Sequence, residues 1–320
     1  RAAGPFRGTH CRTDPRWRHL IPASADAHGG RSIVPVFELL VAGILLGGLY
    51  ALMACGLNLV FGVMRVINFA HGDLMAVGAL TAVSLVAGMH MPYLAALILV
   101  PLMTAAIGLA MQYAVIRHII DGPPIMSLLA TFALSTIVVN ISLLIWGGGF
   151  HGLSTVLGGS IPLLGIDVPL ARLVSFLVAM TATLGVWWFL RSTRFGKAIR
   201  SVSQAAELAV ISGISINQVR NVTFALGAAM AGLAGVLLAP TFASDAQLGA
   251  RFGIKAFAVI IVGGMGSYPG AMAAALLMGV LEVFAGYMYG QVLGAATVFL
   301  AMLVVLIVRP RGLFGIGARA

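Results

Sequence analysis

The side chains best suited to chemistry in this chain lie in a short polar stretch between two apolar runs. Arg65, Asn68, His71 and Asp73 occupy it, and glycines flank it. Where helices break at membrane depth, the freed backbone groups must find partners or line a wet cavity. Two interpretations stay open: the stretch lines or gates a path through a membrane, or it is a cytoplasmic turn capped by Asp73. The candidates for such a translocation path are Asn58, Arg65, Asn68, His71 and Asp73.

Other chemistries find little support in the sequence. A lone histidine such as His71, without nearby cysteines or paired acids, seldom binds a metal. The only cysteines, Cys11 and Cys55, cannot build a disulfide framework or a metal cluster. A phosphate-binding loop needs Ser or Thr after its Gly-Lys pair, whereas Gly196-Lys197 is followed by alanine. No Ser/His/Asp set or HExxH motif occurs. We therefore expect no enzyme, no metal, no cofactor and no ATP hydrolysis by this chain.

Two acids, Glu38 and Glu282, are the carboxylates most apt to lie near membrane depth. An ion-coupled carrier needs an ionisable residue inside its bundle whose charge changes during transport, and Glu282 could be that residue. It could equally lie near a membrane boundary, because Tyr287 and Tyr289 follow and aromatic belts mark such boundaries.

The composition predicts an integral membrane protein. Of 320 residues 60% are hydrophobic and 9% charged, and the mean hydropathy is +1.05, which excludes an ordinary soluble fold. About 20 apolar residues cross a bilayer as a helix. We predict an all-α polytopic bundle of about eight to ten transmembrane segments, with breaks at 89–92 and 147–149. Residues 33–64 form either one helix or two broken near 54–58, and 254–262 form a half-helix ending at 263–266.

Basic residues predict the orientation, because short loops rich in Lys and Arg stay in the cytoplasm. Such residues fill the segment 191–220 and recur at the C-terminus, so both are predicted inside, with four passes between them. Before the segment, six passes would leave the N-terminus inside and five would leave it outside. The arginines of the first 31 residues favour inside.

Residues 1–32 are basic and lack an apolar core, so they form no signal peptide. We expect a disordered or mis-annotated N-terminal extension, followed by one transmembrane domain over 33–320. The tail contributes to the formal net charge of +10, and the remainder is what basic cytoplasmic loops give. The sequence therefore predicts a lipid bilayer, and no nucleic acid, as partner.

The segment 191–217 is the one extended amphipathic stretch between apolar runs. As a helix from Gly196 to Ser212, it places one polar face opposite one apolar face, and Gly213 stands where helices commonly end in left-handed geometry. The polar face holds Lys197, Arg200, Gln204 and Glu207, and the apolar face holds Ile199, Val202, Ala206, Ala209 and Val210. Such a helix could lie on anionic headgroups or dock on a partner protein.

The segment also carries a family resemblance. Glu207-Leu208-Ala209, followed by Gly213, resembles the EAA loop of ABC-transporter permease subunits, although that family has alanine where Leu208 stands. In that family the loop forms a coupling helix that sits in a cleft of the ATP-hydrolysing subunit. The resemblance implies that the ATPase-coupling residues are Arg194, Gly196, Lys197, Arg200, Glu207, Ala209 and Gly213.

A second resemblance covers most of the chain from Phe37 to Phe314. The segment 56–78 (GLNLVFGVMRVINFAHGDLMAVG) is similar to the signature of LivH-type branched-chain amino acid ABC permeases, as are 193–240, GGMGSYPG at 263–270 and RPRGLF at 309–314. The resemblance implies a multi-pass permease of the bacterial inner membrane. Its implied partners are two cytoplasmic ATPase subunits, a second permease of LivM type, and a periplasmic or lipid-anchored binding protein.

The residues of the predicted transmembrane segments do not identify the transported solute. Branched-chain or similar hydrophobic amino acids are what the resemblance implies. Related permeases carry amides, urea or, more distantly, sugars, and an ion-coupled secondary carrier is the remaining alternative.

Overall fold

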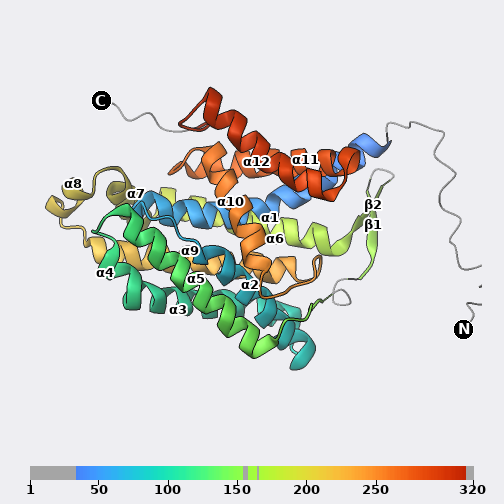
Figure 1. The fold of residues 1–320 in the computed structure, drawn as a ribbon, viewed down its shortest axis with the longest axis horizontal. Coiled ribbons are helices and arrows are strands. Elements are labelled where there is room, and N and C mark those ends of the chain that lie inside the picture. The colour runs from blue at the N-terminus through green and yellow to red at the C-terminus, as the bar shows by residue number, and fades with distance from the viewer. Residues whose placement is uncertain (1–33, 154–157, 164–165, 315–320) are drawn as a thin grey trace, which may run out of the picture.

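A computed structural model describes residues 34–153, 158–163 and 166–314 of this chain. In these ranges it is a helical bundle with one small β-hairpin (Figure 1). The helices before the hairpin are α1 (Val34–Met64), α2 (Ala70–Val83), α3 (Tyr93–Met111), α4 (Arg117–Ile119) and α5 (Pro124–Trp146). The π-helical turns η2 (Ser84–Gly88) and η3 (Gln112–Ile116) extend α2 and α3.

The second half of the chain is also helical. After the strands β1 (Ser160–Leu163) and β2 (Ile166–Pro169) come α6 (Leu170–Ser192), α7 (Arg194–Gln204), α8 (Ala206–Ile211), α9 (Ile216–Leu238), α10 (Leu248–Gly263), α11 (Tyr268–Tyr289) and α12 (Gln291–Val308). The antiparallel pairing of β1 with β2 adds a strand pair that the all-α prediction did not contain. Ile166 and Val168 of β2 are buried against Leu45 of α1, which closes this end of the bundle.

Eight helices in the described part of the chain are long and apolar enough to cross a bilayer. The chain is therefore a multi-pass membrane protein, within the predicted eight to ten spans. The first apolar run is one unbroken helix, α1, rather than two. The predicted breaks are confirmed, since Pro92 precedes α3 and Gly147 follows α5 with φ 74°.

The helices α1, α2 and α9 form the centre of the bundle. Most of their residues are buried, whereas few residues of α5 and α12 are, as expected for helices that face lipid or a partner. Close packing at the centre relies on small residues: Gly78 of α2 meets Gly232 of α9, and Gly235 of α9 meets the backbone of α2 at Met75. Small side chains let membrane helices approach closely.

The short helix α10 ends where the sequence predicts, at Gly263, and Gly264 and Gly266 both have positive φ. It begins earlier than predicted, at Leu248, because its two cations find carboxylates: Arg251 bonds Asp245 and Lys255 bonds Glu282. These pairs let charged residues extend the helix into the bundle.

Five of the eight spans precede α7, and three spans plus α10 follow α8. The start of α1 therefore lies at the opposite end of the bundle from α7 and α8, while the end of α12 returns to their end (Figure 1). With α7 and α8 inside, this count favours five preceding passes over the six that the N-terminal arginines favoured, because α1 is unbroken. The predicted N-terminal extension, residues 1–32, lies outside the described residues. The predicted domain boundary at residue 33 therefore stays a prediction.

Candidate functional site

The polar stretch of the sequence is a buried connection between α1 and α2, called here the polar connection (residues 65–73). Helix α1 ends at Met64, and Arg65 has a positive φ of 53°. The chain then runs back along α1, so that the His71 ring Nε2 lies 3.2 Å from the Met53 carbonyl oxygen. At 1.5 Å per residue, Met53 is roughly 16 Å from the end of α1. The connection therefore enters the bundle instead of turning at its surface.

Asp73 does not cap α2. The residue before the helix, Phe69, makes no side-chain capping bond, and Asp73 lies inside the first turn with 3% of its surface exposed. The predicted cap by Asp73 is therefore wrong, because this residue is buried inside the first turn and the helix has no side-chain capping bond.

The five path candidates fall into three groups. Asn68, His71 and Asp73 are all buried along the connection. Asn58 is buried elsewhere on α1, where its Oδ1 accepts the Gly266 backbone N–H at 2.8 Å and fixes the turn between α10 and α11. Arg65 is exposed at the end of α1.

Two buried acceptors in the connection lack partners. Asn68 Oδ1 and Asp73 Oδ2 make no hydrogen bond to any residue that the structure describes. By contrast the backbone of the connection is held, because the Thr131 hydroxyl donates to the Ile67 carbonyl at 2.9 Å. Buried polar groups are nearly always paired, so these two oxygens are suited to a transient polar partner.

An aromatic residue that sequence reasoning missed stands beside these acceptors. Phe69 is 42% exposed and packs edge-on against Phe132 of α5, with ring centroids 6.4 Å apart, and stacked on Phe257 of α10 at 6.5 Å. The available signal was a phenylalanine placed between the polar residues Asn68 and His71. The three rings form an apolar border where the connection reaches the surface between α5 and α10.

The second candidate region is the α7–α8 segment (residues 191–217), at one end of the bundle (Figure 1). Thr193 links α6 to α7: its Oγ1 accepts the Gly196 N–H at 2.9 Å and donates to the Phe189 carbonyl at 2.8 Å. Gly196 must be glycine, since a Cβ there would lie 2.4 Å from the Phe189 carbonyl oxygen. A hydroxyl cap and a close glycine contact thus fix how α7 leaves the membrane helix.

Within α7 the predicted faces are present. Ile199 and Val202 are buried against the bundle, while Arg194, Lys197 and Arg200 are exposed. The positive charges therefore point away from the bundle, where a lipid headgroup or a protein partner could meet them.

The single helix predicted from Gly196 to Ser212 is wrong. Ala205, with φ −152° and ψ 89°, divides it into α7 and α8. The serines before this break compete with helical bonding, since the Ser203 hydroxyl donates to the Arg200 carbonyl at 2.8 Å. As a result Ala209 is buried as predicted, whereas Ala206 and Val210, predicted on the apolar inner face, are exposed.

The short helix α8 presents an unusual surface. Leu208, Val210 and Ile211 are 65%, 54% and 82% exposed beside the exposed carboxylate of Glu207. Gly213 ends the helix with φ 77°, which confirms its predicted left-handed geometry. These exposed apolar side chains, called here the tip of α8, form the kind of surface that a partner protein buries.

A third polar group lies inside the bundle. Lys255 Nζ is 2.5 Å from Glu282 Oε1, and the Tyr50 hydroxyl donates to Glu282 Oε2 at 2.8 Å. Lys255 also lies over the rings of Tyr50 and Phe252. Sequence reasoning considered Glu282 alone and missed its cation, although Lys255 interrupts an apolar run. The bonds to Lys255 and Tyr50 join Glu282 of α11 to α10 and α1, which indicates a structural role for this carboxylate.

No cluster of three or more potential metal ligands occurs among the described residues. The arrangement offers polar groups along the connection between α1 and α2 and an exposed apolar surface on α8 at one end of the bundle.

Comparison with known proteins gives a consistent result. The family model described as branched-chain amino acid transport system / permease component matches residues 39–308. The high-affinity branched-chain amino acid transport system permease protein BraD of Pseudomonas aeruginosa is 30% identical over 86% of this chain and 94% of its own. LivH of Escherichia coli, of the same description, is 28% identical over 85% and 93%. The ribose import permease protein RbsC of Escherichia coli is 25% identical over 79% and 81%.

Proposed function

This chain belongs to the family of permease components of branched-chain amino acid transport systems, and we propose that it is the membrane permease subunit of an ABC importer in the bacterial inner membrane. Its solutes are branched-chain or similar hydrophobic amino acids. The higher identity to BraD and LivH than to RbsC supports this solute class over a sugar.

The observation that carries the proposal is the exposed apolar tip of α8 on a segment anchored firmly to the bundle. The cap at Thr193 and the close contact at Gly196 make α7 a rigid continuation of α6. A force applied to Leu208 and Ile211 would therefore reach the membrane helices. That is the mechanical requirement for a subunit driven by a separate motor.

The proposed motor is a pair of cytoplasmic ATPase subunits, whose closure on ATP binding moves the α7–α8 segment. The residues assigned to this coupling are Arg194, Gly196, Lys197, Arg200, Glu207, Ala209 and Gly213. A second permease subunit of LivM type and a periplasmic or lipid-anchored binding protein complete the importer. In this arrangement residues 33–320 act as one permease domain, with α7 and α8 in the cytoplasm.

The polar connection is the proposed wall of the translocation path. Helix breaks at membrane depth, with irregular backbone and polar side chains, are where transport proteins place their solute sites. Asn68, His71 and Asp73 supply the polar groups, and Phe69 supplies an apolar border suited to a hydrophobic side chain. Arg65 lies at the start of the connection, and Asn58 acts from α1 through its bond to the turn between α10 and α11.

A charge placed on the tip of α8 tests the coupling role. The variant Ile211→Asp should insert normally but lose both ATPase co-purification and uptake of labelled leucine, because the apolar contact would have to bury a carboxylate. Ile161→Asp is the matched control: it makes the same change at an exposed isoleucine in β1, at the opposite end of the molecule. Normal uptake by Ile211→Asp would refute the coupling role of α8.

The solute class is tested by competition. Uptake of labelled leucine by cells that express the complete importer should fall with excess isoleucine or valine and stay unchanged with excess ribose or urea. Inhibition by ribose or urea alone would move the assignment to another solute.

A further inference from the structure

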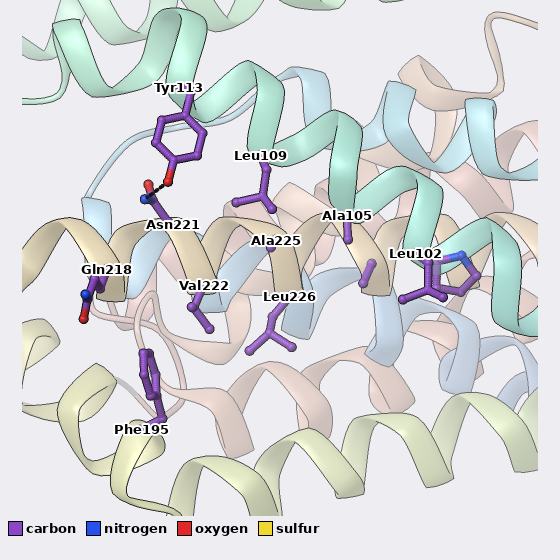
Figure 2. A pocket seen from close by; sticks show the side chains of 12 residues that line it. Leu102, Ala105, Leu109, Tyr113, Phe195, Gln218, Asn221, Val222, Ala225 and Leu226 are labelled. Carbon is purple, nitrogen blue, oxygen red and sulfur yellow. Dashed lines mark hydrogen bonds between the residues drawn. The ribbon is translucent and has the colours of Figure 1, made fainter.

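A long groove crosses the outside of the bundle on the face of α9, between α3 and α6. Its larger part has a volume of about 710 Å³ and is lined by α3 and α9, with Phe195 of α7 at one side (Figure 2). A second hollow of about 380 Å³ continues it toward α6. The two share Pro101, Leu226 and Ala229, so they form one continuous depression, called here the α9 groove.

The α9 groove is amphiphilic along its length. From Leu102 to Leu109 on α3, and from Val222 to Leu233 on α9, its lining is apolar. Polar groups gather only at the end near α7, where the Asn221 amide donates to the Tyr113 hydroxyl at 2.8 Å and Gln218 lies beside them (Figure 2). A ligand that fits must be apolar over most of its length and polar at one end.

The polar end also carries positive charge. The Arg117 guanidinium lies 5.6 Å from the centre of the ring of Tyr113, so a cation stands beside a residue that lines the polar end of the groove. Arg220 precedes Asn221 in the chain, but its guanidinium forms a salt bridge with the Asp121 carboxylate at 3.0 Å. Among the residues that the structure describes, Arg117 forms no salt bridge, which leaves its charge available to an anion.

We propose that the α9 groove binds one anionic phospholipid, with an acyl chain along α9 and the headgroup phosphate at Arg117 and Gln218. The groove is flanked by α3 and α6, most of whose residues are not buried, and its polar end lies at the end of the bundle that holds the basic α7. Basic pockets between membrane helices on the cytoplasmic side recognise anionic headgroups in this way. Because Phe195 of α7 forms part of the wall, the lipid contacts the α7–α8 segment and braces it against α3.

Lipid binding to the purified full-length chain tests the proposal. Native mass spectrometry in mild detergent would titrate dioleoylphosphatidylglycerol and dioleoylphosphatidylcholine separately. We expect the wild-type chain to bind phosphatidylglycerol about tenfold more tightly than phosphatidylcholine. Equal affinity for the two lipids would overturn the role of Arg117.

Two variants separate the chain site from the headgroup site. Ala225→Phe fills the groove and should weaken binding of both lipids by about tenfold or more, whereas Ala296→Phe, the same change at an exposed position of α12, should leave both unchanged. Arg117→Gln, at an exposed position where folding is not at risk, should bring the two affinities together. Wild-type binding by Ala225→Phe, or a full preference retained by Arg117→Gln, would contradict the proposal.

Discussion

Lys255 of α10 and Glu282 of α11 form an ion pair inside the bundle, with Nζ and Oε1 2.5 Å apart and each side chain 14% exposed. The hydroxyl of Tyr50 bonds the same carboxylate, so three helices meet at one charge pair. Since α10 is too short to be held by apolar burial across a full span, this pair is a main anchor of α10 in the bundle.

Removal of one charge of the Lys255–Glu282 pair should lower the free energy of unfolding much more than removal of both. Lys255→Met leaves a carboxylate unpaired in the interior and should lower the free energy of unfolding by about 3 to 5 kcal/mol. The double variant Lys255→Met with Glu282→Gln should recover most of this loss, because no buried charge remains. Thermal unfolding in detergent measures both.

A surface pair serves as control for this experiment. Asp121→Asn alters the bond to Arg220 at a side chain that is 78% exposed, and should cost less than about 1 kcal/mol. If Lys255→Met cost no more than Asp121→Asn, the pair would not anchor α10.

The structural contacts of Glu282 also bear on how transport is driven. An ion-coupled carrier needs an ionisable residue whose charge changes during transport, whereas Lys255 and Tyr50 both bond Glu282 and tie it to α10 and α1. Uptake by proteoliposomes that contain the complete importer should therefore require ATP and continue when a protonophore collapses the proton gradient. Uptake that stops with the gradient while ATP is present would support the ion-coupled alternative.

The effect of a glycine substitution on stability should depend on how closely a neighbouring helix approaches that glycine. A Cβ on Gly235 would lie 2.1 Å from the Met75 carbonyl oxygen, so Gly235→Ala must push α9 away from α2 and should destabilise the bundle. Gly185 of α6 has open space around it, and Gly185→Ala should be neutral or stabilising by up to about 1 kcal/mol from helix propensity. The difference in unfolding temperature between the two variants measures the contact.

What the sequence predicted well depends on local signals. Pro92 precedes α3, Gly147 follows α5, and Gly213 has its predicted left-handed geometry, because each of these effects acts within a few residues. The buried Ile199 and Val202 of α7 also followed from periodicity alone. The family resemblance pointed to the same segments.

What the sequence did not predict depends on contacts between distant segments. The partner of Glu282 lies on another helix, and the return of the polar connection to Met53 requires the packed bundle around it. No proline or glycine lies at the break at Ala205. The spacing of polar and apolar residues suits a straight helix, so it predicted one helix where the structure has two. The β-hairpin also has a weak sequence pattern, since four residues per strand are too few to show a clear alternation.

The N-terminal extension gives a prediction that needs no structure. Residues 1–31 contain no apolar core that could insert into a bilayer, and α1 begins at Val34. Deletion of 1–31 should leave membrane insertion and leucine uptake unchanged, as measured in cells against the full-length chain. A loss of either would show that the extension contributes to the permease.

Asn68 separates a role in transport from a role in folding. Its buried Oδ1 makes no hydrogen bond to the described residues, so Asn68→Ala removes an unpaired polar group, and the unfolding temperature should stay the same or rise. If the polar connection lines the path, uptake should nevertheless fall by about tenfold or more while the ATPase still co-purifies. Asn140→Ala, which removes only a bond to Thr136 within α5, is the matched control and should transport normally. Wild-type uptake by Asn68→Ala would return the connection to a purely structural role, because a stable protein with an intact motor contact would then transport without this buried acceptor.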